Sequence, residues 1–173
     1  MDAQSLSTAR ALGQFKENMI YIGTKLINAE PMTRAAYNSF RGWELPANEN
    51  GADEGYLVEY QDGGKPNVVG RAGYVSWSPK EQFDAAYRPI NAMTFGLAIE
   101  ALKLGKKVAR AGWNGKGIFI ELQRPDENSK MTSPYIFIDT TGLQTDNPAA
   151  PKSRVPWLAS QTDMLAEDWQ VVE

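Results

Sequence analysis

The chain has 173 residues, 42% of them hydrophobic and 23% charged, which is typical of a folded protein with one ordinary domain or two small ones. Because it contains neither cysteine nor histidine, disulfides, thiolate nucleophiles, Ser-His-Asp triads and most transition-metal sites are excluded, which favours a binding protein over an enzyme. The net charge of -3 argues against binding of long nucleic acid, and no apolar stretch approaches the ~20 residues of a membrane span.

The first half of the chain predicts a terminal helix followed by a small sheet with helices. Leu6, Ala9, Leu12 and Phe15 have helical spacing, so we expect an amphipathic helix within residues 1–19. Further on, alternating residues predict strands, and capping residues before apolar faces predict helices. The expected elements are strands over 20–29, 55–60 and 73–77, a helix over 34–40 between Thr33 and Gly42, and a helix opened by a capping box at Ser78-Pro79-Lys80-Glu81.

The second half predicts a second set of strands and helices. A helix is expected over 93–104 with Gly105 as its stop, and a short helix after Ser160. Residues 142–153 show no periodic pattern and are expected to be irregular. Strands are expected over 106–111, 118–123, 134–139 and 169–172, and the apolar segment 155–158 precedes the short helix. We therefore predict an α+β fold with two small modules, residues 20–90 and 91–173, each a short antiparallel sheet with one or two helices.

Matched landmarks suggest that the two modules are a divergent duplication. Ile27-Asn28-Ala29 and Ile90-Asn91-Ala92 are each followed by Met-Thr, a predicted helix and a Gly-Trp pair, at Gly42-Trp43 and Gly112-Trp113. The alternative is that strand-helix-strand segments reuse the same caps and aromatic residues independently. A common strand order in the two modules would favour duplication.

A basic run follows the predicted helix over 93–104. No acid lies between Ala101 and Ile120, and the run holds five of the 18 cations. In a net-acidic protein this forms a local anion-attracting surface, large enough for a pyrophosphate. The alternative is a solvated helix end, because lysines favour a helix C-terminus. The five cations are Lys103, Lys106, Lys107, Arg110 and Lys116.

Aromatic residues and a polar segment make a second candidate site. Aromatic faces stack on purine or nicotinamide rings, and amides beside them can bind a base edge or a ribose, although most tryptophans serve core packing. Ser160 and Asp163 also fit a helix cap, which leaves Gln161 and Thr162 unexplained. No spacing singles out a catalytic pair of carboxylates. The candidate ligand-binding residues are Arg110, Trp113, Asn114, Gly115, Phe119, Tyr135, Trp157, Ser160, Gln161, Thr162 and Asp163.

Residues 92–173 resemble a small bacteriophage family. The segments that carry the resemblance are MTFGLAIEALKLGKKVARAGWNGKGIFIEL, PYIFI and VPWLASQTDMLAEDWQVVE, with the motifs Gly112 to Lys116 and Trp157 to Trp169. They are similar to the Thoeris anti-defence proteins of the signal-sequestering type, a domain that is also labelled a type II-A anti-CRISPR. The part before residue 91 is not needed by the family core and looks like a module of uncharacterised phage proteins.

The resemblance implies a protein that binds a cyclic ADP-ribose isomer without cleaving it, so that a defence effector is never activated. It also implies a compact α+β domain that forms a homo-tetramer with ligand sites between subunits, and relatives that capture cyclic oligonucleotides. Carried onto matching positions, Trp113, Asn114, Phe119, Trp157 and the segment 161–163 would line the pocket. Arg110 is our own addition, as a ligand for the phosphates. The stretch from Gln123 to Trp157, with its Pro-Ala-Ala-Pro insertion, departs from shorter members.

The expected partners are therefore a cyclic nucleotide signal and further copies of the chain, with no cofactor, metal, membrane or long nucleic acid. Because the start of the sequence lacks a basic-then-apolar signal segment, we expect the protein in the cytoplasm of an infected bacterium. A second hypothesis is a protein inhibitor of a CRISPR nuclease, with the acidic residues of 163–173 imitating phosphates. A metal-dependent carboxylate enzyme is the third and least supported.

Overall fold

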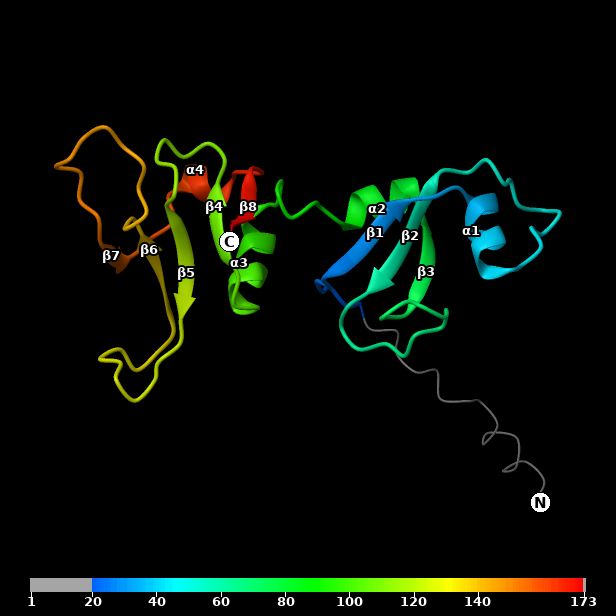
Figure 1. Cartoon of the computed structure of the whole chain (residues 1–173), viewed down its shortest axis with the longest axis horizontal. Helices are drawn as coiled ribbons and strands as arrows, with labels where there is room; N and C mark the ends of the chain where they lie inside the picture. Colours follow the sequence, from blue (N-terminus) through cyan, green and yellow to red (C-terminus); the bar gives the residue numbers. More distant parts are fainter. Residues whose placement is uncertain (1–19, 173) are drawn as a thin grey trace, which may run out of the picture.

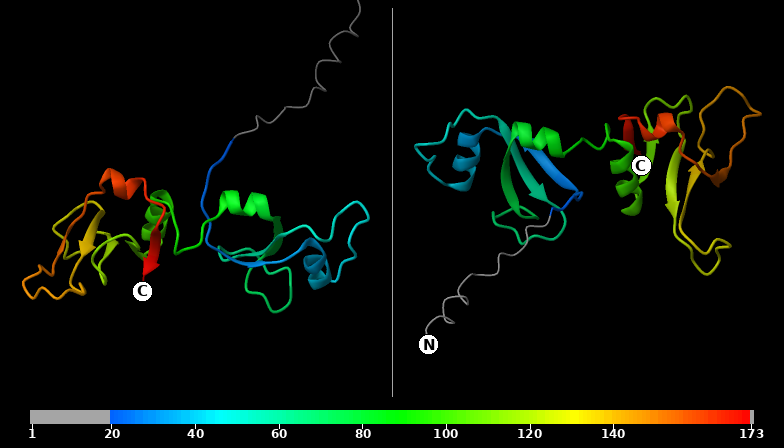
Figure 2. Two further views of the ribbon diagram at one scale, coloured as in Figure 1. Left: turned by 90° about the horizontal axis from the view of Figure 1, so that it is seen from above. Right: turned by 180° about the vertical axis from the view of Figure 1, so that it is seen from behind.

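The computed structural model describes residues 20–172, which form two lobes joined by one extended segment (Figure 1). The helix expected within residues 1–19 lies outside this part of the chain. The described residues contain four short helices and eight strands in two antiparallel sheets, which confirms the predicted α+β class. The views in Figure 2 show the same two lobes. The proposed domain boundary at residues 90 and 91 lies in the joining segment.

The N-terminal lobe is a three-stranded sheet with a helix on each side. Strand β1 is shorter than expected because β2 ends opposite its first residue, in the pair Ile27 and Tyr60, and leaves residues 20–26 without a partner strand. The strand continues through Pro31, which an edge strand tolerates. In sheet order, the strands are β1 (Ile27–Pro31), β2 (Gly55–Tyr60) and β3 (Val75–Pro79); the helices are α1 (Arg34–Arg41) and α2 (Lys80–Ala86).

Local chemistry sets the ends of α1, but not the start of α2. The Thr33 side chain accepts a hydrogen bond from the Ala36 backbone, and Gly42 ends α1 with a φ of 68°; both were predicted. The capping box predicted at Ser78 is wrong. Ser78 still belongs to β3, where it pairs with Tyr56, and its hydroxyl donates to the Pro79 carbonyl. Pro79 is the N-cap of α2, without a side-chain cap.

The C-terminal lobe is a five-stranded sheet whose order does not follow the chain. The last strand, β8, pairs with β4 and not with β7, so the chain crosses the lobe between residues 157 and 168 and brings α4 to the end of β4. In sheet order, the strands are β7 (Arg154–Pro156), β6 (Tyr135–Asp139), β5 (Phe119–Gln123), β4 (Lys107–Arg110) and β8 (Trp169–Val172); the helices are α3 (Phe95–Lys103) and α4 (Gln161–Met164).

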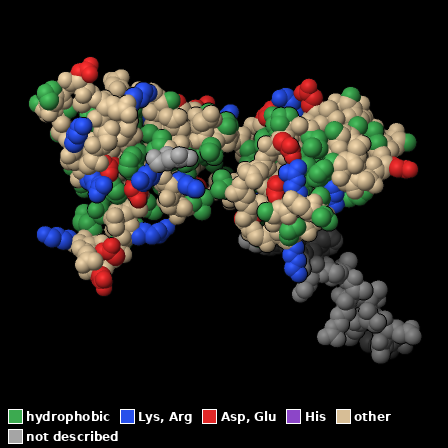
Figure 3. Space-filling model, in the orientation of Figure 1, with side chains coloured by type: hydrophobic (Ala, Val, Ile, Leu, Met, Phe, Trp, Pro, Cys, Tyr) green, Lys and Arg blue, Asp and Glu red, His purple; other side chains and the backbone are tan. Residues whose placement is uncertain are grey.

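The core of this lobe lies between α3 and one face of the sheet. Leu102 of α3 packs with Val108, Ile120 and Trp169, all of which are buried. Val108 and Ile120 are directly opposite each other on neighbouring strands, so their side chains share a face. On the visible side of the lobe, Lys and Arg side chains surround an apolar area (Figure 3).

The two sheets have different strand orders, so the matched landmarks do not extend to a common topology. Gly42-Trp43 directly follows α1, whereas Gly112-Trp113 follows strand β4. Landmarks that match in sequence order therefore lie at different places in the two lobes. This favours independent reuse of caps and aromatic residues over duplication.

Within residues 20–172, no helix is both long enough and apolar enough to cross a membrane.

Candidate functional site

Asp163, in the first turn of α4, is the centre of a hydrogen-bond network between three segments of the C-terminal lobe. One carboxylate oxygen accepts bonds from the guanidinium of Arg110, at 3.0 Å, and from the indole of Trp113, at 3.2 Å. The other oxygen accepts bonds from the backbone and hydroxyl of Ser160, at 3.1 and 2.6 Å. The network therefore joins the end of β4, the turn after it and the start of α4.

The bonds between Ser160 and Asp163 form the capping box of α4, because the Ser160 hydroxyl also accepts a hydrogen bond from the Asp163 backbone. The sequence predicted this cap, and the structure confirms it. Asp163 thus has two tasks, since it caps its own helix and holds residues about 50 positions earlier in the chain.

Arg110 lies between two carboxylates. Its second bond runs to Asp168, at 2.8 Å, and the other oxygen of Asp168 accepts the Gly112 backbone at 2.7 Å. These pairs hold the start of the 112–117 turn against the segment before β8. Because two donors of Arg110 point at carboxylates, the side chain positions Asp163 and Asp168; phosphate binding by Arg110 stays a prediction.

The network keeps both carboxylates ionised. Burial acts to raise the pKa of Asp163, but the bonds from Ser160, Arg110 and Trp113 outweigh it and lower the pKa to about 2. For Asp168, the hydrogen bond from Arg110 is the main cause of a lowered pKa. A general acid or base needs a pKa close to the working pH. Neither carboxylate is therefore suited to exchange protons near neutral pH.

Three tryptophans pack next to the network. Trp113 lies edge-on to Trp169 and Trp157, with ring centroids 5.4 and 6.2 Å apart. Trp169 is fully buried, and its indole donates to the Asp163 backbone carbonyl at 3.0 Å. Trp113 and Trp157 are only half-buried at the rim of this core. Both the packing and the binding interpretation of these two residues are thus consistent with their places.

Close backbone approaches fix the turn after Trp113. Gly117 has a φ of 76°, and a Cβ there would lie 2.2 Å from the Gly142 carbonyl oxygen. A Cβ on Gly115 would lie 2.8 Å from Leu143 and 3.0 Å from Ile118. The 112–117 turn is thus held against the 142–144 segment at Gly117, where only glycine fits, whereas the neighbours of Gly115 are side-chain ends that can shift.

Exposed polar side chains border the network. Asn114 is exposed on the turn, and Ser160, Gln161 and Thr162 are exposed at the start of α4. The hydroxyls of Ser160 and Thr162 are 2.8 Å apart. Since Trp113 and Asp163 are bonded, the turn and the start of α4 lie side by side. Amide and hydroxyl groups from both segments are therefore available to a ligand.

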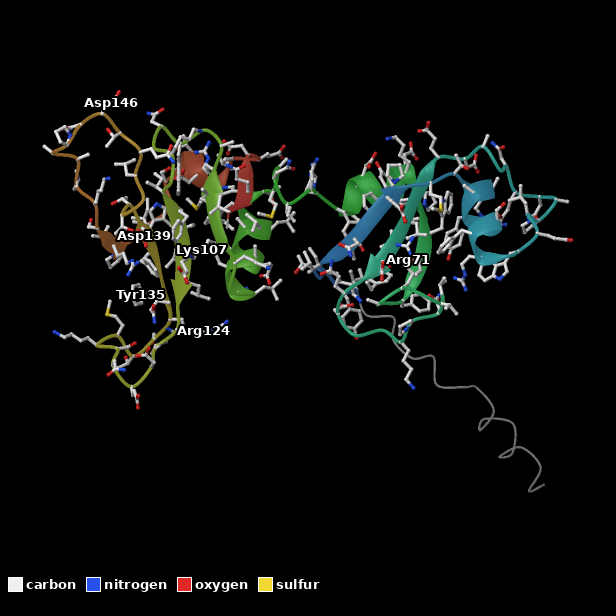
Figure 4. All side chains as sticks on the ribbon, in the orientation of Figure 1. Arg71, Lys107, Arg124, Tyr135, Asp139 and Asp146 are labelled. Atoms are coloured by element: carbon white, nitrogen blue, oxygen red, sulfur yellow. The ribbon has the colours of Figure 1, made fainter. Side chains whose placement is uncertain are left out.

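Phe119 and Tyr135 lie apart from this group within one chain. Phe119 neighbours the buried Ile120 along β5, so its ring is on the sheet face opposite α3, where the Lys107 ammonium is 4.7 Å from the ring centroid. Tyr135 is at the end of β6 far from α4, near Arg124 (Figure 4). Their roles as ligand-binding residues stay predictions.

Sequence reasoning missed the parts played by Asp168 and Trp169. The spacing of Asp163 and Asp168 carries no motif, and Arg110 lies 58 residues before Asp168. The available signal was that β8 follows Asp168 directly, so an antiparallel strand paired with the start of β8 would end beside this carboxylate. Among the described residues, no group of three or more acidic side chains has a metal-binding arrangement.

The C-terminal lobe matches known proteins. Residues 93–172 match the Thoeris anti-defense 2-like domain, from the residue before the Thr94 cap of α3 to the last residue of β8. Thoeris anti-defense 2 of Bacillus phage SP01 is 39% identical over 93 residues, which cover 46% of this chain and 94% of that protein. The N-terminal lobe lies outside the matched domain. The chain belongs to the Thoeris anti-defense 2 family, an anti-defence family of bacteriophages.

Proposed function

We propose that the C-terminal lobe captures a cyclic ADP-ribose isomer, the signal of a Thoeris-type defence, and holds it uncleaved. The observation that carries this proposal is the Asp163 network beside exposed hydrogen-bonding groups. Its carboxylates are ionised and bonded, so they position neighbours and do not transfer protons. The surrounding amides and hydroxyls supply contacts to a polar ligand. Such a site favours affinity without turnover, which sequestration requires.

The ligand contacts follow from the chemistry of the bordering groups. Trp113 and Trp157 offer partly exposed aromatic surface to an adenine ring, and stacking contributes roughly 1 to 3 kcal/mol per base. Asn114, Gln161 and Thr162 offer amide and hydroxyl groups to ribose and phosphate oxygens. Because the Asp163 network holds these segments in place before binding, little conformational entropy is lost on capture. Cyclic oligonucleotides share the same base, ribose and phosphate chemistry.

A second copy of the chain would complete the site. Leu158 and Leu165, on either side of α4, are 91% and 82% exposed, and Met164 is 46% exposed. Exposed apolar residues gathered near a candidate site are typical of a surface that another protein covers. We propose that this surface is an interface of a homo-oligomer, a tetramer by the family resemblance. Phe119, on the sheet face opposite α3, and Tyr135, at the end of β6 far from α4, would then contact ligand bound by a neighbouring copy.

Replacement of Asn114 or Thr162 by Ala tests the proposal without disturbing the Asp163 bonds. Each variant should bind the cyclic ADP-ribose isomer about tenfold more weakly, because a hydrogen bond to a charged ligand contributes roughly 1.5 to 3 kcal/mol. Isothermal titration calorimetry measures the affinity. The matched control is Asn128→Ala, an exposed asparagine on the β5–β6 loop of the same lobe, which should bind like the original chain. Unchanged affinity in both site variants would remove this surface from the ligand site.

A further inference from the structure

The N-terminal lobe carries a shallow groove with an aromatic wall. Two adjoining hollows, of about 330 and 310 Å³, share Asp53, Trp77 and Pro79. Arg34 and Glu49 line the first hollow as well. The remaining lining residues of the second hollow are Glu54, Lys80, Glu81 and Gln82. The groove lies in the part of the chain outside the matched Thoeris anti-defense 2-like domain.

The aromatic wall is rigid. The Trp77 indole donates to the Met32 carbonyl at 2.8 Å, and a Cβ on Gly55 would lie 2.5 Å from the Trp77 ring, so the ring rests on the β2 backbone. The Arg34 guanidinium lies over the ring, 5.1 Å from its centroid, and is itself held by Glu49. Because Gly55 and Arg34 cover part of the ring, the preformed apolar surface that a ligand would meet is the exposed Pro79 with the part of the Trp77 ring that remains open.

The charges beside this wall are unbalanced. Arg34 pairs with Glu49, and Lys80 pairs with Asp84 at 3.4 Å. Both cations of the groove are thus neutralised within the lobe. Asp53, Glu54 and Glu81 are exposed carboxylates in addition to these pairs. A groove with an apolar wall and excess negative charge fits an occupant that presents lysines next to an aliphatic side chain.

The chain itself presents such a segment at the end of α3. Leu104 is 65% exposed, although it lies between an apolar helix and a buried strand. Gly105, with a φ of 78°, turns the chain outward between the exposed Lys103 and Lys106. Lys103 forms an exposed ion pair with Glu100 at 2.6 Å, a kind of pair that contributes little to stability. In Figure 1 this turn lies at the lower end of α3. Residues 103–106 thus form a protruding Lys-Leu-Gly-Lys turn.

We propose that the groove binds the 103–106 turn of a second copy of this chain. Leu104 packs against Pro79 and the open part of the Trp77 ring, Lys106 pairs with one of the carboxylates of Glu54 and Glu81, and Lys103 exchanges its exposed partner Glu100 for the other. If the 103–106 turn of each copy binds the groove of the other copy, the two copies form a closed twofold dimer and not a filament. The contact uses neither the α4 surface nor the residues assigned to ligand capture. It gives the N-terminal lobe a role in linking subunits.

Zero-length carbodiimide coupling tests the contact, because it joins only carboxylates and amines that already touch. Full-length chains labelled with ¹⁴N and ¹⁵N are mixed, coupled and analysed by mass spectrometry. We expect coupling of Glu54 or Glu81 to Lys103 or Lys106 in mixed-isotope peptide pairs. Coupling only within single-isotope pairs would overturn the proposal, because the turn would then belong to the same chain.

A variant that keeps the coupling chemistry distinguishes docking from chance encounters. Leu104→Ser leaves every lysine and carboxylate in place, yet should reduce the mixed-isotope yield about tenfold, since the buried leucine supplies the apolar contact. Met131→Ser is the control, an exposed residue on the β5–β6 loop, and should leave the yield unchanged. Equal yields from Leu104→Ser and the original chain would overturn the proposal. Ligand affinity should be the same in both variants, which separates this test from that of the proposed function.

Discussion

Asp163 shows how one side chain joins local structure to the candidate site. Among the described residues, it accepts four side-chain or backbone hydrogen bonds, from Ser160 twice, Arg110 and Trp113. A buried carboxylate with this many donors costs little to keep ionised, whereas loss of its charge would leave Arg110 with only one carboxylate partner. The residue therefore stabilises the lobe and aligns the groups that border it.

Replacement of Asp163 by Asn should lower the free energy of unfolding of the C-terminal lobe by about 2 to 4 kcal/mol, because the amide turns a donor toward donors and removes a buried charge partner. Urea unfolding followed by tryptophan fluorescence measures the loss. Asp146→Asn is the matched control, since Asp146 is exposed in the 142–153 loop (Figure 4). A loss below 0.5 kcal/mol, as roughly expected of a surface change, would contradict the central place of Asp163.

The lowered pKa of Asp163 also predicts how stability depends on pH. A carboxyl with a folded-state pKa of about 2 and an ordinary value of 3.8 stabilises the fold fully above pH 4. That contribution, about 2 kcal/mol, is lost as the pH falls through 2. Asp139, bonded to Thr141 and Arg154, also has a pKa of about 2 and acts in the same direction. Unfolding in urea at pH 5, 3 and 2 should give a shallower pH dependence for Asp163→Asn than for the original chain; equal slopes would refute the assignment.

At the scale of elements, the turn between β4 and β5 depends on glycine at Gly117. Gly117→Ala should cost more than 2 kcal/mol, because a positive φ and a clash with the Gly142 carbonyl oxygen add together. Gly105→Ala is the matched control, with a φ of 78° but open space around the added Cβ, and should cost about 1 kcal/mol. Thermal unfolding of both variants measures the difference. Equal melting temperatures would show that the close approach to Gly142 is not rigid.

Elements that depend on neighbours in the chain were predictable, and those that depend on distant pairing were not. Thr33 and Ser160 cap helices as their positions in the sequence predict, whereas Thr94, expected inside a helix over 93–104, is the N-cap of α3. Ser78 has the same local signature, but its pairing with Tyr56 keeps it in a strand. The pairing of β8 with β4 is likewise non-local, so nothing near Asp168 in the sequence indicated its bond to Arg110.

For the candidate site, individual residues could be predicted from the sequence, but the contacts between them could not. Trp113 and Asp163 were singled out separately, from an aromatic turn and a cap, and the structure bonds them together. Phe119 was grouped with them, although the alternation of Phe119 with the apolar Ile120 along one strand already placed these two side chains on opposite faces of the sheet. Tyr135 could not be placed without the register of β5 and β6, which sets it opposite Gln123.

The whole molecule combines a family domain with an additional lobe. The C-terminal lobe contains the matched residues 93–172 and the Asp163 network. The N-terminal lobe contributes a second sheet with its own core around Leu57 and Val75. We propose that the C-terminal lobe captures the signal and that the N-terminal lobe links copies of the chain. Capture then does not require contact between the two lobes of one molecule.

The central claim is that the whole protein holds its ligand without chemical change. The direct measurement is to incubate the full-length chain with a cyclic ADP-ribose isomer, remove unbound ligand, denature the protein and analyse what is released by liquid chromatography and mass spectrometry. We predict that intact cyclic ligand is recovered in proportion to the protein, and that the recovered amount does not fall with longer incubation. Recovery of linear ADP-ribose, or of no ligand at all, would contradict sequestration.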